Sequence, residues 1–338
     1  MGCAIPILCG ETCGRGGRWQ SNCSNSPGAC GTRSSSPTPI SNWASTSSLS
    51  PNWRWHVNIW STASLCTIRN GAAPAASRHG VNCASNCHSF LTRVFWHLGH
   101  PDEALHHSEQ AIAIARDVSH PFSQGVALSW TTALHQLRGE TKRTHELAKR
   151  LLAFATEQVF PFLAAQAMVF RGWSLVELGQ GDKGLTQVRA GLTAYRGTGA
   201  ELESSHWLGL LADACLDTGQ AEEGLRTIAE ALGHVAQTGV VYYEAELHRL
   251  DGELRLRSDA PDEQRAEMSF HRALEIARQQ QAKSWELRAA TSMARLWRDQ
   301  DKRQQAHDLL APVYDWFTEG FDTLDLKEAK ALLEQLKA

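Results

Sequence analysis

The sequence LGHPDEAL at residues 98–105 recurs as LGQGDKGL at residues 178–185 and as TGQAEEGL at residues 218–225. A weaker copy surrounds the glycine at position 139, so that the glycines follow one another at 40-residue steps, at Gly99, Gly139, Gly179 and Gly219. Self-similarity at a constant period of this length is typical of stacked repeat units, none of which buries its apolar face alone. The sequence therefore predicts an array of repeats downstream of about residue 90.

Each repeat contains two predicted helices. The first carries apolar residues at three- and four-residue spacing, as in residues 163–176 and 287–297, and the glycine of the turn then ends it. The second begins with acidic residues, such as Asp102 and Glu103, which suit the positive end of a helix dipole. We therefore expect an all-α fold, a right-handed α-solenoid of about six tetratricopeptide-like helix pairs.

Small residues recur where the two helices of a repeat are expected to touch. Glycine inside a helix is unfavourable by about 1 kcal/mol relative to alanine, so its recurrence at one position indicates close packing. In the first helices these positions are Gly172, Ala212, Gly252 and Ala294, and in the second helices they are Ala104, Gly184, Gly224, Ala266 and Ala306.

Two stretches near the C-terminus carry a more specific resemblance. The sequences AKSWELRAATS at 282–292 and DLLAPVYDWFTEGFDT at 308–323 resemble the C-terminal region of large bacterial signal-transduction ATPases. In that family an ATPase module, often preceded by an adenylate or guanylate cyclase domain, ends in long tetratricopeptide-like repeats. The resemblance covers about residues 91–338 and implies a sensor or partner-binding array, with no catalytic residue carried onto this chain. A free-standing adaptor and the regulatory tail of a cyclase or ATPase encoded upstream both fit it.

The two ends of the predicted array differ. Residues 323–337 are expected to form a final capping helix with a charged face, in which Asp325 and Glu328 have the spacing of a capping box. At the other end the first helix of the first repeat is recognisable only over residues 90–98.

Residues 1–90 differ in composition from the rest of the chain. They contain one acidic residue, Glu11, no lysine and eight of the nine cysteines, and their charges sum to +5 against −8 for residues 91–338. A zinc module is one interpretation, built either on Cys83, Cys87 and His88 or on Cys9 and Cys13 with Cys23 and Cys30, and a disulfide-stapled domain is a second. The third, which we favour, is that out-of-frame translation produced the segment and that it is disordered. On that hypothesis, deletion of residues 1–89 should leave the stability of the array unchanged.

The sequence offers no complete catalytic motif. It contains no phosphate-binding loop and no nucleophile elbow, and His145-Glu146 is followed by Lys149 where a zinc protease needs its second histidine. Cys215 lies on the packing side of a first helix, which indicates a buried structural thiol. We therefore expect no enzyme, no cofactor and no metal, and a surface position for the histidines His97, His100, His106 and His107.

No stretch approaches the roughly 20 apolar residues that span a bilayer, and the N-terminus lacks the basic region of a secretory signal. The acidic total after residue 90 argues against nucleic acid as a partner. These observations predict a cytoplasmic protein that binds neither membrane nor nucleic acid.

The remaining candidate site is the groove that the first helices should line. Such a groove suits an extended or helical segment of a partner protein, with arginines pairing its carboxylates, although charged helix faces also occur without any ligand. Its expected exposed positions run from acidic to basic along the chain: Gln166, Trp173, Glu177, His206, Asp213, Asp217, Glu246, Arg249, Glu253, Arg288, Arg295 and Arg298.

Overall fold

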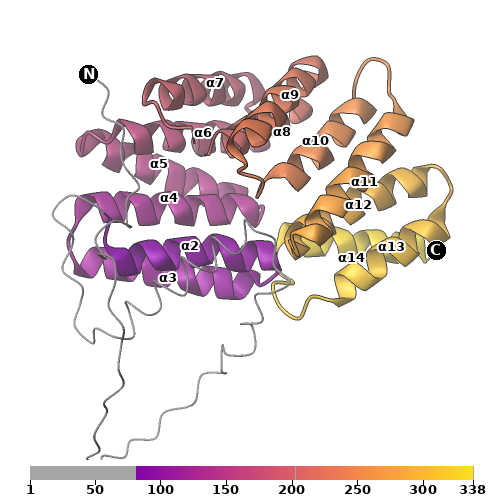
Figure 1. Cartoon of the computed structure of the whole chain (residues 1–338), viewed down its shortest axis with the longest axis horizontal. Coiled ribbons are helices and arrows are strands. Elements are labelled where there is room, and N and C mark those ends of the chain that lie inside the picture. Colours follow the sequence, from indigo (N-terminus) through magenta and orange to yellow (C-terminus); the bar gives the residue numbers. More distant parts are fainter. Residues whose placement is uncertain (1–80, 202, 338) are drawn as a thin grey trace, which may run out of the picture. The chain divides into compact units, whose positions relative to one another are not determined.

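The computed structural model describes residues 81–201 and 203–337, which form thirteen α-helices and no strand (Figure 1). The labels begin at α2. The helices are α2 Cys83–Leu98, α3 Pro101–Asp117, α4 Pro121–Leu137, α5 Thr141–Glu157, α6 Pro161–Glu177, α7 Gly181–Gly197, α8 Ser204–Asp217, α9 Ala221–Thr238, α10 Glu244–Leu256, α11 Glu263–Gln279, α12 Lys283–Asp299, α13 Arg303–Asp315 and α14 Leu324–Leu336. Helices α2 to α13 make six pairs, and α14 follows them, which confirms the predicted solenoid.

The 40-residue period divides into two steps of 20 residues. Helices α3 to α7 have 17 residues each and are separated by turns of three. A residue with positive φ lies in each of these turns and in the next ones, at Gly99, Ser119, Gly139, Val159, Gly179, Gly199, Gly219 and Gly239. In the turn after α6, Gln180 N–H donates to Leu175 O at 2.8 Å, the closing bond of a helix that ends in a left-handed residue.

Close backbone contact within a repeat is clearest between α6 and α7. A Cβ atom added to Gly172 would lie 2.6 Å from Val188 N and 2.8 Å from Gly184 O, and one added to Gly184 would lie 2.6 Å from Gly172 O. Neither backbone has room for a side chain there, which confirms the packing reason for the small residues. Ala104, Ala212 and the other predicted alanines are fully buried.

Helix α2 begins seven residues before the predicted start at residue 90. Asn82 caps it by accepting a hydrogen bond from Ser85 N–H at 3.0 Å, and Ser85 Oγ donates to Ala111 O of α3 at 2.9 Å. Ser85 and Ser89 are completely buried. The first turns of α2 pack through small polar side chains, so an apolar period could not reveal them.

This start corrects the expectation for a deletion of residues 1–89. Such a deletion would remove the N-cap and nearly two turns of a packed helix. The interpretations that concern residues 1–80, including their out-of-frame origin, lie outside the described residues.

Helix α14 is one residue shorter at each end than predicted. Its N-cap is Thr323, whose side chain makes no capping hydrogen bond, so the expected capping box is wrong. Asp325 and Glu328 are instead paired with arginines of α12, as described below. Leu326, Ala329, Leu332 and Leu336 bury the opposite face of α14 against α12 and α13.

Candidate functional site

Four of the twelve predicted groove residues are buried, contrary to the expectation that all are exposed. Gln166 and Trp173 of α6 retain 5% of their accessible surface, His206 of α8 retains 2% and Glu246 of α10 retains 3%. Gln166, His206, Glu246 and Arg288 hold equivalent positions in the first halves of α6, α8, α10 and α12, and we name them the N-terminal row.

Helices α2 and α4 contact two members of this row, Gln166 and Arg288. Ser129 of α4 donates to Gln166 Oε1 at 2.6 Å, and the backbone carbonyl of Leu137, at the end of α4, accepts from Arg288 Nη2 at 2.6 Å. The guanidinium of Arg288 also lies 5.3 Å from the ring centre of Trp96 of α2. The 40-residue period gives no sign of the contacts with Arg288, because they join residues 151 and 192 positions apart.

Arg93 of α2 makes a second contact over the row. It forms a bidentate ion pair with Glu203 at 3.0 and 2.8 Å, and its guanidinium lies between the rings of Trp130 and Tyr242, at 4.1 and 4.5 Å from their centres. His206 lies beside this pair, and burial lowers its pKa to about 3, so its ring is neutral at pH 7. None of these contacts was predicted from the sequence.

Glu246 and Arg288 are joined by a third member of the predicted set, Arg249. Glu246 accepts from Arg249 at 2.8 Å and from Arg288 at 3.1 Å. Burial alone would raise the pKa of Glu246, but the two guanidinium groups lower it. The carboxylate is therefore ionised and fully paired inside the protein.

The second halves of the first helices carry another set of charged residues, which remain accessible. Glu177 and Asp217 are exposed, and Asp213, Glu253, Arg295 and Arg298 are partly exposed. We name these six residues the C-terminal row. Trp173 lies beneath them and donates from Nε1 to Asp213 Oδ2 at 2.8 Å.

The acidic end of the C-terminal row is crowded. Burial and the neighbouring charge of Asp217 raise the pKa of Asp213 to about 6. Partial desolvation and a hydrogen bond with Asp217 also raise the pKa of Glu177, and Glu328 of α14 adds to this effect. A cation or a positively charged group placed here would relieve this repulsion.

Helix α14 occupies the basic end. Arg288 pairs with Asp325 at 2.9 Å, Arg295 with Glu328 at 2.7 Å, and Arg298 Nη1 donates to Gln335 Oε1 at 2.8 Å. The arginines that were expected to bind a partner's carboxylates thus bind carboxylates of this chain. The three-residue spacing of Asp325 and Glu328 places both on one helix face, but it was interpreted as a capping box, so this pairing was missed.

The other candidate residues form no reactive arrangement. Cys215 is completely buried and burial raises the pKa of its thiol to about 12, as expected of a structural cysteine. His97 is 1% exposed, so the expectation of a surface position is wrong for it. His88 and His107 share a hydrogen bond of 2.9 Å between their Nδ1 atoms. Among residues 81–201 and 203–337, no three His, Cys, Asp or Glu side chains gather closely enough to hold a metal ion.

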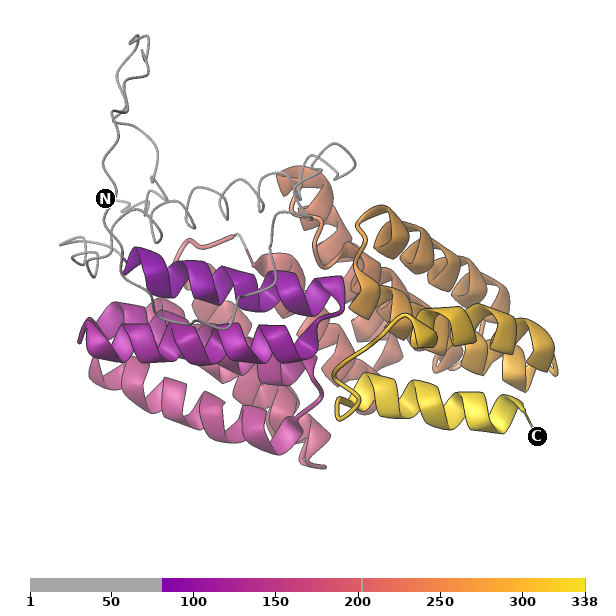
Figure 2. The same ribbon diagram turned by 90° about the horizontal axis from the view of Figure 1, so that it is seen from below.

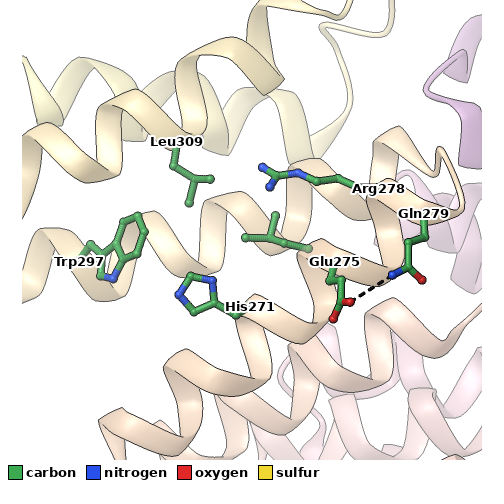
Figure 3. A pocket seen from close by; sticks show the side chains of 7 residues that line it. His271, Glu275, Arg278, Gln279, Trp297 and Leu309 are labelled. Carbon is green, nitrogen blue, oxygen red and sulfur yellow. Dashed lines mark hydrogen bonds between the residues drawn. The ribbon is translucent and has the colours of Figure 1, made fainter.

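A hollow of about 440 Å³ lies between α11, α12 and α13 (Figure 3). Its walls include Trp297, Leu309, His271 and Arg278, and one rim carries a hydrogen bond of 3.1 Å from Gln279 Nε2 to Glu275 Oε1. The indole of Trp297 donates to Glu267 at 2.7 Å. The sequence did not point to this hollow.

No helix in the described part of the chain is long and apolar enough to cross a membrane.

No protein-family model matches the sequence. A curated protein of Rhizobium meliloti (strain 1021), itself described as uncharacterised, is 28% identical over 186 residues, which make up 55% of this chain and 18% of that protein. The chain thus spans less than a fifth of the length of the relative that it matches.

Three solved structures share the fold. The complex of NprR with its cognate peptide NprX matches 84% of both chains with a TM-score of 0.55 and 14% identity. RapI in its apo form matches 83% of this chain and 99% of its own, with a TM-score of 0.53 and 10% identity. A Rap protein with competence and sporulation factor matches 85% of this chain and 80% of its own, with a TM-score of 0.51 and 13% identity. At these identities the likeness shows the helical-repeat fold alone.

Proposed function

We propose that this chain is a non-catalytic scaffold that binds a segment of a partner protein or a peptide along the C-terminal row. The observation that carries the proposal is the alignment of exposed and partly exposed charged residues on four successive first helices, beside the N-terminal row. A repeat array presents such a surface to an extended or helical segment, which can contact several repeats at once. Two of the proteins that share the fold are described as complexes with peptide or factor ligands, which supports this class of partner.

The charges of the row indicate the character of the segment. Glu177, Asp213 and Asp217 are close together and the ion pair of Asp217 with Arg257 is long, at 3.9 Å, so a segment with basic residues facing α6 and α8 would lower their mutual repulsion. At the other end Glu328 of α14 pairs with Arg295 and Asp299 pairs with Arg298, so both arginines are already neutralised in part. We therefore expect the acidic end to contribute most of the binding free energy.

A displayed library of random peptides provides the test. Peptides selected on the full chain should lose about tenfold in affinity when Asp213 and Asp217 are both replaced by asparagine. The matched control replaces Asp182 and Glu222, exposed acids at the starts of the second helices α7 and α9, and should leave affinity unchanged. Selection of no binding peptide, or equal losses in both pairs, would contradict the proposal.

A second candidate function is that of a regulatory region within a longer signal-transduction protein, joined to or encoded beside an ATPase or a cyclase. The match to 18% of a much longer curated relative favours it, as does the resemblance of residues 282–292 and 308–323 to the repeats of signal-transduction ATPases. Sequencing the DNA upstream of the gene tests it. An adjoining reading frame with a phosphate-binding loop or a cyclase domain is the expected result, and a free-standing gene would contradict it.

A further inference from the structure

The first two repeats contact the C-terminal segment of the chain. The loop between α13 and α14 lies beside the ends of the helices of these repeats (Figure 2). Contacts join the turns after α2 and α4 to the start of α12 and to residues 316–324. We name this set of contacts the clasp. The hydrogen bonds that join the first two repeats to α12 and to residues 316–324 link residues 151 to 218 positions apart, so they are not contacts between neighbouring repeats.

Arg138, in the turn after α4, is at the centre of the clasp. Its side chain is 2% exposed, and its donors reach Glu140 at 2.6 Å, Pro101 O at 2.9 Å and both carboxylate oxygens of Asp322 at 3.2 and 3.1 Å. A buried guanidinium needs such partners, because burying its charge without them is strongly unfavourable. Asp322 comes from the loop before α14, so this ion pair joins the two ends of the array.

The same loop caps helix α3. Glu319 Oε1 accepts from the backbone N–H groups of Asp102 and Glu103 at 3.0 and 3.4 Å, where a carboxylate complements the positive end of the helix. Gly320 N–H donates to Asp102 Oδ2 at 3.2 Å. Gly320 has φ +73°, and a Cβ atom at this position would overlap the ring of Pro101. The loop therefore fits against α3 only with glycine at position 320.

Apolar contacts continue the clasp toward α12. Trp96 and Trp285 are both buried, their ring centres are 4.7 Å apart, and Ser284 Oγ donates to Trp96 O at 2.5 Å. Next to them, Arg288 of the N-terminal row donates to Leu137 O and holds Glu246. The clasp thus contacts Arg288 of the N-terminal row directly and Glu246 through Arg288.

We propose that the clasp is an autoinhibitory contact, which keeps Arg288 and Glu246 away from a partner segment when closed and makes them accessible when it opens. This inference rests on the proposed function in taking a protein segment as the ligand. Opening solvates the charged groups at Arg138 and also separates the buried rings of Trp96 and Trp285, so the closed and open forms differ by polar contacts, which water can replace, and by apolar contacts, which it cannot. The full inner surface, with both rows, is then available only in the open form.

Gly320→Ala in the full chain opens the clasp without touching either row. Gly179→Ala is its matched control, because Gly179 has φ +79° and a Cβ atom there would meet nothing within 4 Å. Hydrogen exchange should accelerate about tenfold in residues 96–104 and 316–324 of G320A, with α6 and α7 unchanged. Acceleration spread over all helices, or none in these two segments, would overturn the clasp.

The accessibility of Arg288, in the N-terminal row, is measured without any partner. Phenylglyoxal modifies accessible arginines, and mass spectrometry gives the rate at each site. Arg288 should react about fivefold faster in G320A than in the wild type or G179A, while the exposed Arg189 reacts equally in all three. Equal rates at Arg288 would overturn the autoinhibitory role. Because neither experiment uses a peptide, failure of the peptide selection leaves these outcomes intact and refutes the proposed function separately.

Discussion

The turns after α4 and α6 occupy the same place in successive repeats, yet their surroundings differ completely. Gly139 and Gly179 have nearly the same conformation, with φ values of +72° and +79°. A Cβ atom on Gly139 would lie 2.6 Å from Leu324 Cβ, whereas one on Gly179 would meet nothing within 4 Å. The preceding residues, Arg138 and Leu178, are 2% and 38% exposed.

This difference separates what a repeat specifies from what the whole array specifies. The repeat determines the backbone of the turn, because each helix must end and reverse after the same number of residues. The contact with the C-terminal segment determines which side chains the turn carries, since of these two turns only the one after α4 has partners there. Positions that break the repeat pattern, such as Arg138, therefore mark the contacts that join its two ends.

The largest effect is expected from alanine at the two glycines. Both substitutions impose a left-handed backbone on alanine, which is unfavourable by about 1 kcal/mol, and Gly139→Ala adds an overlap with Leu324 that raises the loss to about 3 kcal/mol. Urea unfolding followed by circular dichroism measures both. Equal losses of stability would show that the turn after α4 is as free as the turn after α6.

Replacement of the residue before each glycine should have a smaller effect. Arg138→Ala leaves Asp322 and Glu140 without their cation and opens a polar gap, with an expected loss of about 2 kcal/mol after allowance for the exposure of the acids. Leu178→Ala removes a partly exposed side chain and should change stability by less than about 0.5 kcal/mol. Urea unfolding measures the loss of stability in both variants. Similar losses for Arg138→Ala and Leu178→Ala would show that Arg138 does not contribute the central contacts of the clasp.

The turn between α5 and α6 has valine where the turns after α4 and α6 have glycine, so it isolates the contribution of a left-handed backbone to stability. Val159, between α5 and α6, has φ +55° and is 80% exposed, so it has a left-handed backbone with few side-chain contacts. Val159→Gly should stabilise the protein by about 0.5–1 kcal/mol, because relief of this strain exceeds the entropy lost by glycine. A higher midpoint of thermal unfolding is the expected observation. If Val159→Gly instead destabilises the protein, the free energy that we assign to a left-handed backbone in the other turns is too large.

The smallest effect concerns acid. The hydrogen bond from His135, together with Arg138, lowers the pKa of Glu140 to about 2 despite partial burial. A carboxyl whose pKa is lowered on folding adds stability that is complete above about pH 4.5 and disappears as the pH falls toward 2. Glu140→Gln should therefore flatten the fall in stability between pH 4.5 and 2, by less than about 1 kcal/mol since the side chain is partly exposed. The equivalent residue of the next repeat is Gln180, and its replacement by alanine should leave the shape of the pH curve unchanged.

The sequence predicted the repeat well and the contacts between its ends poorly. Glycines at 40-residue steps and small residues at helix contacts predicted the helix pairs, because these features reflect interactions within one repeat or between neighbours. The burial of Gln166 depends on Ser129 of α4, and Arg288 is held by Leu137 O and Trp96 from a distant part of the chain. The 40-residue period does not predict contacts between repeats that are far apart in the sequence.

The start of α2 was missed for a different reason. Ser85 and Ser89 are buried through hydrogen bonds to backbone carbonyls, so a helix forms there without apolar residues at helical spacing. The arginines of α12 show a third kind of difference. Their charges were correctly taken to need carboxylates, but Asp325 and Glu328 supply those carboxylates from within the chain.

A double-mutant cycle between Arg138 and Asp322 tests the central claim, that the two ends of the array bind each other, most directly. The two residues are 184 positions apart and their side chains are 3.1 Å apart. Unfolding free energies of the wild type, Arg138→Ala, Asp322→Ala and the double variant give their coupling energy. We expect about 1 kcal/mol of favourable coupling, and additive losses with no coupling would contradict the clasp.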